Sequence, residues 1–275
     1  MPVQGGQHRL GLEYLSVFGM PVLDYAELAG RLECDFISLN FSGAANRLEP
    51  YPPECLRDDP ALRQSLARKV RDLGLNICLV EGFAITPDIS IDAYAADLEA
   101  AAEMGASVIC AVSLDKDLER TFDQFCGLAE VGAQHGLIVT TEVGAGVVRN
   151  LDTARAALTA VAHENFRLLL DTMHFFRRGA TVEDLAAIPP ASLGHVQLCD
   201  VPMPAQGNSY LEEALFERRG LGEGDLPLRS LIDALPEPLP LGLEIPIRSQ
   251  YARGLSAFER LRHSIRLARE WLEDR

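Results

Sequence analysis

Residues 136–144, GLIVTTEVG, show the pattern that decides the fold. Gly136 follows a helix-like segment, a short run rich in β-branched residues comes next, and Glu142 stands near the end of that run. Glycine readily adopts the left-handed conformation that ends many helices, and short apolar runs bounded by glycine are typical of buried strands. The stretch therefore predicts a helix end, a buried strand and an acidic group at the carboxyl end of the strand.

The same unit is repeated along the chain. Apolar runs rich in strand-forming residues occur eight times, at 9–15, 35–40, 76–80, 107–112, 137–143, 167–171, 195–199 and 241–245. Helix-like segments lie between them at 23–32, 60–73, 91–104, 114–134, 151–162, 182–188 and 228–235, and another at 255–272 follows the last strand. Gly74 and Gly105 occupy the same place as Gly136 in their own units. Eight apolar strands that alternate with helices fit a closed parallel barrel better than an open sheet, so we predict an α/β fold, a single (β/α)₈ TIM barrel over residues 1–275.

Composition limits the partners and the location that we expect. The chain has 40 Asp and Glu against 25 Lys and Arg, a formal net charge of -15, which repels phosphate backbones and anionic lipid surfaces. We therefore expect a small-molecule partner and neither nucleic acid nor a membrane. The N-terminal MPVQGGQHRLGLEYL has no leader-like apolar run, which favours a cytoplasmic protein. The six cysteines form no C-x-x-C pair, so we expect reduced thiols that pack in the core.

Polar residues stand at the carboxyl ends of the last four predicted strands. They are Glu142 in IVTTEVG, Asp171 in RLLLDTMH, His195 in GHVQLCD and Glu244 in LGLEIP. Any one of them alone would more often form a buried salt bridge or cap a helix. Four on consecutive strands of a barrel converge on one mouth, where something must compensate them, and this convergence suggests a cation. Three carboxylates and one imidazole favour Mn²⁺ or Mg²⁺, with Co²⁺ or Zn²⁺ as substitutes.

The order of these residues resembles the xylose isomerase-like superfamily of sugar phosphate isomerases and epimerases. The shared features are a Glu ending strand five, D-x-x-H at strand six, a His at strand seven, an Arg before a Gly-rich stretch and a Glu on strand eight. In the ketose 3-epimerases of that superfamily, the groups at Glu142, Asp171, His195 and Glu244 bind the metal. The resemblance thus implies a xylose-isomerase-like barrel with a one-metal site formed by these four residues.

The resemblance also implies residues that contact substrate. The histidine of D-x-x-H is His174, and the arginine of the family is Arg218 in ERRGLGEG. Arg219 is the adjacent alternative, because Leu221 stands where the family usually has Pro. Both arginines could also be solvated surface residues in a polar loop.

Further residues near the predicted strand ends are candidates for the lining of the pocket. Gln197 should share the inward face of His195 because side chains alternate along a strand. Glu81 is a candidate substrate contact, and Glu13 faces the same mouth. Three aromatic residues could form an apolar wall there, although packing is the commoner role for such residues: Phe83, Phe175 and Phe176.

The function implied by the resemblance is a divalent-metal-dependent isomerase or epimerase of a small keto-sugar or polyol-derived ketone. In such enzymes a metal-stabilised enediolate forms, and two glutamates, here Glu142 and Glu244, remove and return a proton. The same site could expel a β-hydroxyl, as in dehydratases of the inosose or 3-dehydroshikimate type. A non-catalytic metabolite-binding barrel is the third reading, and homo-oligomers are common in the superfamily. The trinuclear zinc site of its apurinic endonucleases is not expected, because position 197 is Gln in place of the second His of H-x-H.

Overall fold

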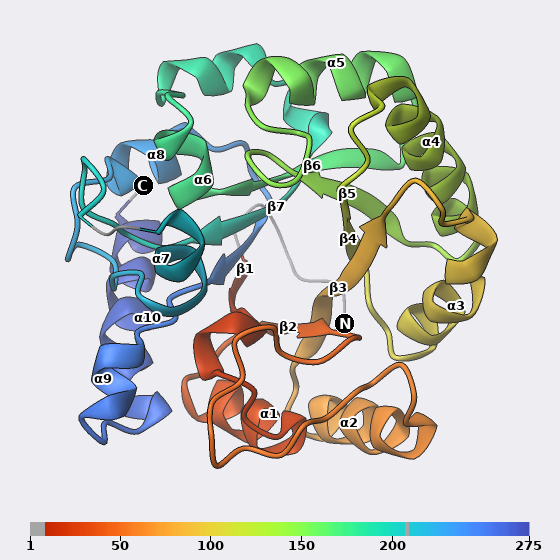
Figure 1. Ribbon diagram of the computed structural model, residues 1–275. Coiled ribbons are helices and arrows are strands. Elements are labelled where there is room, and N and C mark those ends of the chain that lie inside the picture. Colours follow the sequence, from red (N-terminus) through yellow and green to blue (C-terminus); the bar gives the residue numbers. More distant parts are fainter. Residues whose placement is uncertain (1–8, 207–208, 275) are drawn as a thin grey trace.

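A closed barrel of eight parallel strands forms the centre of the molecule in the computed structural model, which describes residues 9–206 and 209–274. The strands follow one another around the barrel in sequence order, as Figure 1 shows. They are β1 (Arg9–Leu12), β2 (Phe36–Asn40), β3 (Asn76–Ile85), β4 (Val108–Ser113), β5 (Ile138–Glu142), β6 (Phe166–Asp171), β7 (Leu193–Leu198) and β8 (Pro240–Leu243). The ladder from Arg9–Pro240 to Leu12–Leu243 joins β1 to β8 and closes the ring. The predicted TIM barrel is confirmed.

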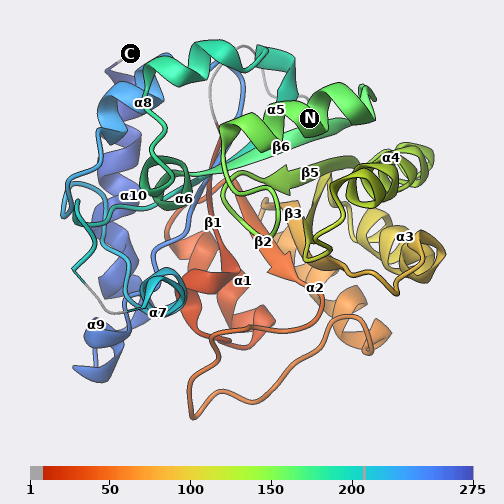
Figure 2. The same cartoon turned by 45° about the horizontal axis from the view of Figure 1, so that its top comes forward.

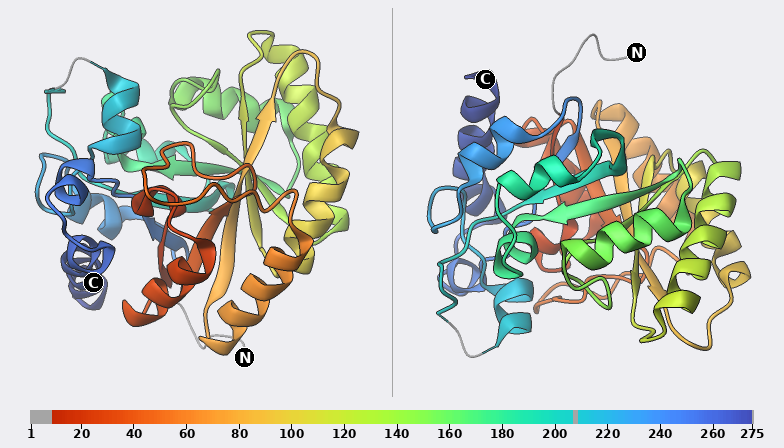
Figure 3. Two further views of the ribbon diagram at one scale, coloured as in Figure 1. Left: turned by 60° about the horizontal axis from the view of Figure 1, so that its bottom comes forward. Right: turned by 90° about the horizontal axis from the view of Figure 1, so that it is seen from above.

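Helices surround the barrel (Figures 1 and 2). They are α1 (Val22–Arg31), α2 (Pro60–Asp72), α3 (Ala95–Glu103), α4 (Leu118–Gln134), α5 (Leu151–Val161), α6 (Thr172–Arg177), α7 (Tyr210–Phe216), α8 (Leu228–Ala234), α9 (Arg248–Ala252) and α10 (Ala257–Glu273). The three expected glycine caps are left-handed, with φ of 71° at Gly74, 86° at Gly105 and 71° at Gly136. α8 and α9 both pack against α10, and Figure 3 shows the three on one side of the barrel.

The structure differs from the predicted elements mainly at short helices. The segment predicted as a helix at 182–188 is a 3₁₀ turn, Glu183–Ala187. Three helices of five to seven residues were not predicted: α6, α7 and α9. Fewer than two helical turns give no apolar periodicity to detect. α7 lies inside the long connection at 200–225, so this connection is partly ordered by a helix.

The core is apolar, and its thiols are free. Cys34, Cys78, Cys110 and Cys199 are buried, and all six cysteines are unpaired, as expected. Phe83, Phe175 and Phe176 are buried in the main core, in agreement with packing, the commoner of the two roles considered for them. None of the described helices is both long and apolar enough to span a membrane.

Candidate functional site

Three side chains come together where β5 and β6 end. Ligand atoms of Glu142, Asp171 and His174 all lie within 4.8 Å of one another, and this group can hold a metal ion. His174 Nε2 is 3.2 Å from Glu142 Oε1. The D-x-x-H spacing explains the placement of the histidine: Asp171 caps α6 and accepts a hydrogen bond of 2.8 Å from the backbone N–H of His174. The sequence motif therefore places two of these three side chains within a single helical turn.

Arg218 links this group to Glu244. Its side chain is only 2% exposed, and Nη1 contacts Asp171 Oδ2 and lies 2.9 Å from Glu244 Oε2. The guanidinium Nε–H donates to the carbonyl of Ala214 at 2.8 Å. The neighbouring Arg219 is exposed, and its backbone pairs with Asp200 outside the site. Of the two candidate arginines, the structure therefore brings only Arg218 to the carboxylates.

The structure does not bring His195 to the other three expected ligands. In the β6–β7 ladder Asp171 is level with Gln197, whereas His195 is level with Leu169, two residues deeper in the barrel. Two residues along a strand correspond to roughly 6–7 Å. His195 Nε2 instead lies 2.7 Å from Glu13 Oε1.

Gln197 occupies the level at which His195 was expected. Its amide Nε2 donates to Glu244 Oε1 at 3.2 Å and, more weakly, to Glu81 Oε1 at 3.4 Å. Both Gln197 and Glu81 therefore lie in the site as expected, beside a carboxylate that was expected to bind metal. No substrate contact is tested by these distances, so that role stays a prediction for both residues.

Glu13 is a member of the site to which sequence reasoning gave no definite role. It and His195 are both fully buried, next to Cys78, whose Sγ is 3.8 Å from His195 Nδ1. The second oxygen of Glu13, Oε2, is buried without a hydrogen-bond partner among the described residues. Gly242 on β8 makes room for this carboxylate, since a Cβ there would lie 1.5 Å from Glu13 Oε1. The glycine inside this apolar strand is the signal in the sequence, because a glycine within a strand often marks a place where another group approaches closely.

The pKa values of the carboxyl groups show how crowded the site is. Burial raises the pKa of Glu142 and of Glu244 well above the usual range. It raises the pKa of Glu81 to about 7. Burial acts in the same direction on Asp171, but the charges of Arg218 and His174 and the hydrogen bonds from both residues together outweigh burial, and the pKa of Asp171 falls to about 2. At neutral pH these groups must be compensated either by protons or by another cation.

His195 carries one of the compensating charges. Burial disfavours the imidazolium, but the Glu13 carboxylate and the bond to Cys78 outweigh it and raise the pKa of His195 to about 10. His195 and Arg218 thus supply two positive charges against five carboxylates, those of Glu13, Glu81, Glu142, Asp171 and Glu244. A divalent cation would balance part of this excess of negative charge. The carboxylate oxygens together with one imidazole form a donor set that suits Mn²⁺, Mg²⁺ or Zn²⁺.

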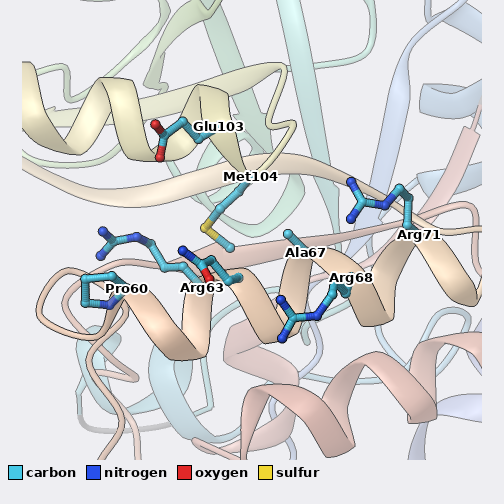
Figure 4. A pocket seen from close by; sticks show the side chains of 8 residues that line it. Pro60, Arg63, Ala67, Arg68, Arg71, Glu103 and Met104 are labelled. Carbon is cyan, nitrogen blue, oxygen red and sulfur yellow. The ribbon is translucent and has the colours of Figure 1, made fainter.

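A second hollow lies on the outer wall and has a different character. The groove of about 330 Å³ along α2 and the end of α3 is lined by Arg63, Arg68 and Arg71, with Glu103 and Met104 opposite (Figure 4). Its charged groups are mostly basic and come from the outward faces of helices. The cluster of buried carboxylates lies instead at the mouth of the barrel, which is where active sites of this fold are found.

Similar folds are found among solved structures. IolI with a bound zinc atom has a TM-score of 0.75 at 18% identity, with 97% of each chain covered. D-psicose 3-epimerase from Clostridium cellulolyticum H10, solved with D-tagatose, has a TM-score of 0.71 at 15% identity, with 96% of this chain and 99% of that one covered. The probable 3-DHS dehydratase AsbF from Bacillus anthracis has a TM-score of 0.73 at 15% identity, with 95% and 98% covered. These likenesses show the shared fold.

The sequence itself gives the family. No curated protein matches the chain. A family model, described as xylose isomerase-like TIM barrel, matches residues 24–274. That match covers most of the chain and includes every residue of the candidate site except Glu13. The chain therefore belongs to the xylose isomerase-like TIM barrel family.

Proposed function

We propose that this protein is a divalent-metal-dependent isomerase or epimerase of a small keto-sugar or polyol-derived ketone. The observation that carries the proposal is the convergence of Glu142, Asp171 and His174 at the barrel mouth, with Glu244 joined to them through Arg218. Five carboxylates gathered around so few cations are costly to bury. Such an arrangement is reasonable where a metal ion and a polar substrate belong.

We assign the metal to Glu142, Asp171 and Glu244, completed by His174 or Gln197. His195, which we expected as the fourth ligand, is held by Glu13 below this set. When bound, a divalent ion supplies Lewis acidity, which polarises a carbonyl and acidifies the adjacent C–H bond. Manganese or magnesium suits the oxygen-rich set better than zinc does.

The residues of the chain would perform the proton transfers. Glu142 and Glu244 come from β5 and from the end of β8, so a substrate in the mouth would meet a carboxyl group from two sides. Burial raises the pKa of both carboxyl groups, which makes each a stronger base than an ordinary glutamate. Deprotonation by one and reprotonation by the other, on opposite faces of a planar enol, inverts a carbon centre.

His174 would orient the substrate oxygen. Burial lowers its pKa, so the imidazole is neutral at pH 7 and can donate a hydrogen bond without adding charge. Nδ1 is hydrogen-bonded to the hydroxyl of Tyr210, and the two rings stack with centroids 5.4 Å apart. Tyr210 thereby holds the ring with Nε2 toward Glu142.

The Tyr210–His174 pair also favours a second candidate, a dehydratase. Loss of a β-hydroxyl from the same enolised substrate needs a proton at the leaving oxygen. A neutral His174 can give its Nε2 proton to the leaving oxygen if Nδ1 takes the proton of the Tyr210 hydroxyl in the same step, and solvent would then reprotonate the tyrosine oxygen. The substrate classes for this reaction are inososes and 3-dehydroshikimate.

Exchange of substrate C–H hydrogens tests both candidates. Purified protein with Mn²⁺ is incubated in D₂O with ketoses, inososes and 3-dehydroshikimate, and proton NMR follows loss of the signal next to the carbonyl. We expect exchange with at least one ketone that stops with EDTA and in Glu142→Gln, but not in Glu103→Gln, whose carboxylate is on the outer wall. An epimeric product supports the first candidate and an enone the second. The proposal is refuted if the Glu142→Gln protein exchanges the C–H hydrogen at the wild-type rate, or if the wild-type protein exchanges it with none of the ketones.

A further inference from the structure

Arg218 contacts the same carboxylates that we assign to the metal. A single guanidinium nitrogen, Nη1, contacts Asp171 Oδ2 and lies 2.9 Å from Glu244 Oε2. The side chains of Arg218, Asp171 and Glu244 are 2%, 0% and 5% exposed. Solvent therefore does not screen these ion pairs, and each contact is a short, charge-assisted one.

The remaining oxygens of these carboxylates are engaged as well, because Asp171 Oδ1 accepts from the backbone N–H of His174 and Glu244 Oε1 accepts from Gln197 Nε2. A divalent ion bound by Asp171 and Glu244 therefore competes with Nη1 for carboxylate lone pairs. Such an ion binds a carboxylate oxygen at roughly 2.0–2.2 Å, which is closer than the nitrogen of a hydrogen-bonding N–H group approaches that oxygen. It would also lie within about 5 Å of a permanently charged guanidinium, where two positive charges repel strongly in a buried site. The arginine cannot give up its proton, since the two carboxylates raise the pKa of Arg218 well above its usual value despite burial.

We propose that Arg218 is a built-in counter-cation that competes with the metal for Asp171 and Glu244. In the metal-free protein it neutralises two buried carboxylates and keeps the mouth folded. On metal binding its guanidinium leaves these oxygens, so the affinity for metal is weaker than the donor set alone would give. This inference rests on the proposed function, because it assumes that the metal binds at this site.

The anchor of Arg218 explains how this competition can occur without unfolding. The Nε–H of the side chain donates to Ala214 in α7, and the backbone N–H of Arg218 donates to Pro246 at 3.0 Å. Neither bond involves a carboxylate. The backbone bond can persist when Nη1 leaves, whereas Nε turns together with Nη1 because the guanidinium is one rigid plane. The freed guanidinium stays at the mouth, where it can donate to an oxygen of the substrate.

Direct measurement of Mn²⁺ binding, by calorimetry and by the loss of the free-ion EPR signal, tests the inference. Arg218→Met removes the charge and keeps the length, and Arg219→Met removes the same charge from the exposed neighbour. We expect Mn²⁺ to bind at least tenfold more tightly to Arg218→Met than to the wild type, and within twofold of the wild type in Arg219→Met. Equal or weaker binding by Arg218→Met would overturn the competition.

Thermal unfolding gives a second readout. In EDTA the Arg218→Met protein should unfold at a lower temperature than the wild type, and Mn²⁺ should raise its midpoint by more than it raises that of the wild type.

If the variant does not fold at all, a crystal structure of the Mn²⁺-loaded wild type decides. A guanidinium that has left Asp171 and Glu244 supports the inference, whereas one that still contacts both beside a bound Mn²⁺ refutes it. Absence of Mn²⁺ binding to wild type and variant alike sinks the metal site and the proposed function with it.

Discussion

The buried pair of His195 and Glu13 makes a prediction that can be worked out in magnitude. Glu13→Gln keeps the shape of the side chain but removes the carboxylate 2.7 Å from His195 Nε2. The pKa of His195 rises from 6.5 to about 10 in the folded protein, and each pKa unit corresponds to about 1.36 kcal/mol. The charged pair therefore stabilises the folded state by at most about 5 kcal/mol, of which about 4 kcal/mol is present at pH 7. Removing one partner of a buried ion pair costs about 3–5 kcal/mol in other proteins, which agrees.

The dependence on pH separates this effect from a simple loss of packing. Because the folded pKa of His195 is raised, its stabilisation is complete below pH 6.5 and is lost as the pH rises through about 10. The difference in unfolding free energy between wild type and Glu13→Gln should thus fall from about 4 kcal/mol near pH 6.5 toward zero above pH 10. Urea titrations at several pH values in EDTA, with Glu103→Gln as the control, measure it. A difference that stays constant with pH, or one below about 1 kcal/mol at pH 7, refutes the buried ion pair.

Two further substitutions test the neighbours of these groups. Gly242→Ala places a Cβ 1.5 Å from Glu13 Oε1, so the carboxylate must move away from His195. We expect the free energy of unfolding, measured in urea at pH 7, to fall by about 3–5 kcal/mol. The double variant with Glu13→Gln should lose less than the sum of the two single losses, because both changes break the same ion pair. Tyr210→Phe removes the hydroxyl that holds His174, and we expect C–H exchange in D₂O to slow about tenfold while the unfolding free energy changes by no more than about 1.5 kcal/mol. Full additivity in the first case, or an unchanged exchange rate in the second, contradicts these assignments.

Most of the barrel could be predicted because its signals are local. A strand of a parallel barrel is buried on both faces, so each of the eight strands appears as an apolar run. A glycine at a helix end, such as Gly136, marks the start of the next strand wherever a left-handed residue is needed. The helices that escaped prediction, α6, α7 and α9, are too short to show a period, and the first two begin at the side-chain caps Asp171 and Ser209.

The site could be predicted only as far as its geometry is local. Asp171 and His174 share one helical turn, so their spacing alone places both at the mouth. His195 and Gln197 present a harder case, because the two lie on the same face of β7 and the sequence contains no measure of depth. Depth depends on how β7 is aligned against β6, and a shift in that ladder between Leu168 and Leu169 sets Asp171 level with Gln197.

That alignment changes the chemistry of the site. With His195 held below by Glu13, the member of β7 beside Glu244 is an amide, which is a weaker and harder donor than imidazole. The only imidazole in the group able to hold a metal is then His174, which the D-x-x-H motif supplies for substrate in the related epimerases. If His174 serves substrate here too, the metal is left with oxygen donors from four strands, and such a set selects manganese or magnesium over zinc. In the function that we propose, the identity of residue 197 on β7 would thus set which cation the site prefers, and Arg218 would set how tightly it binds.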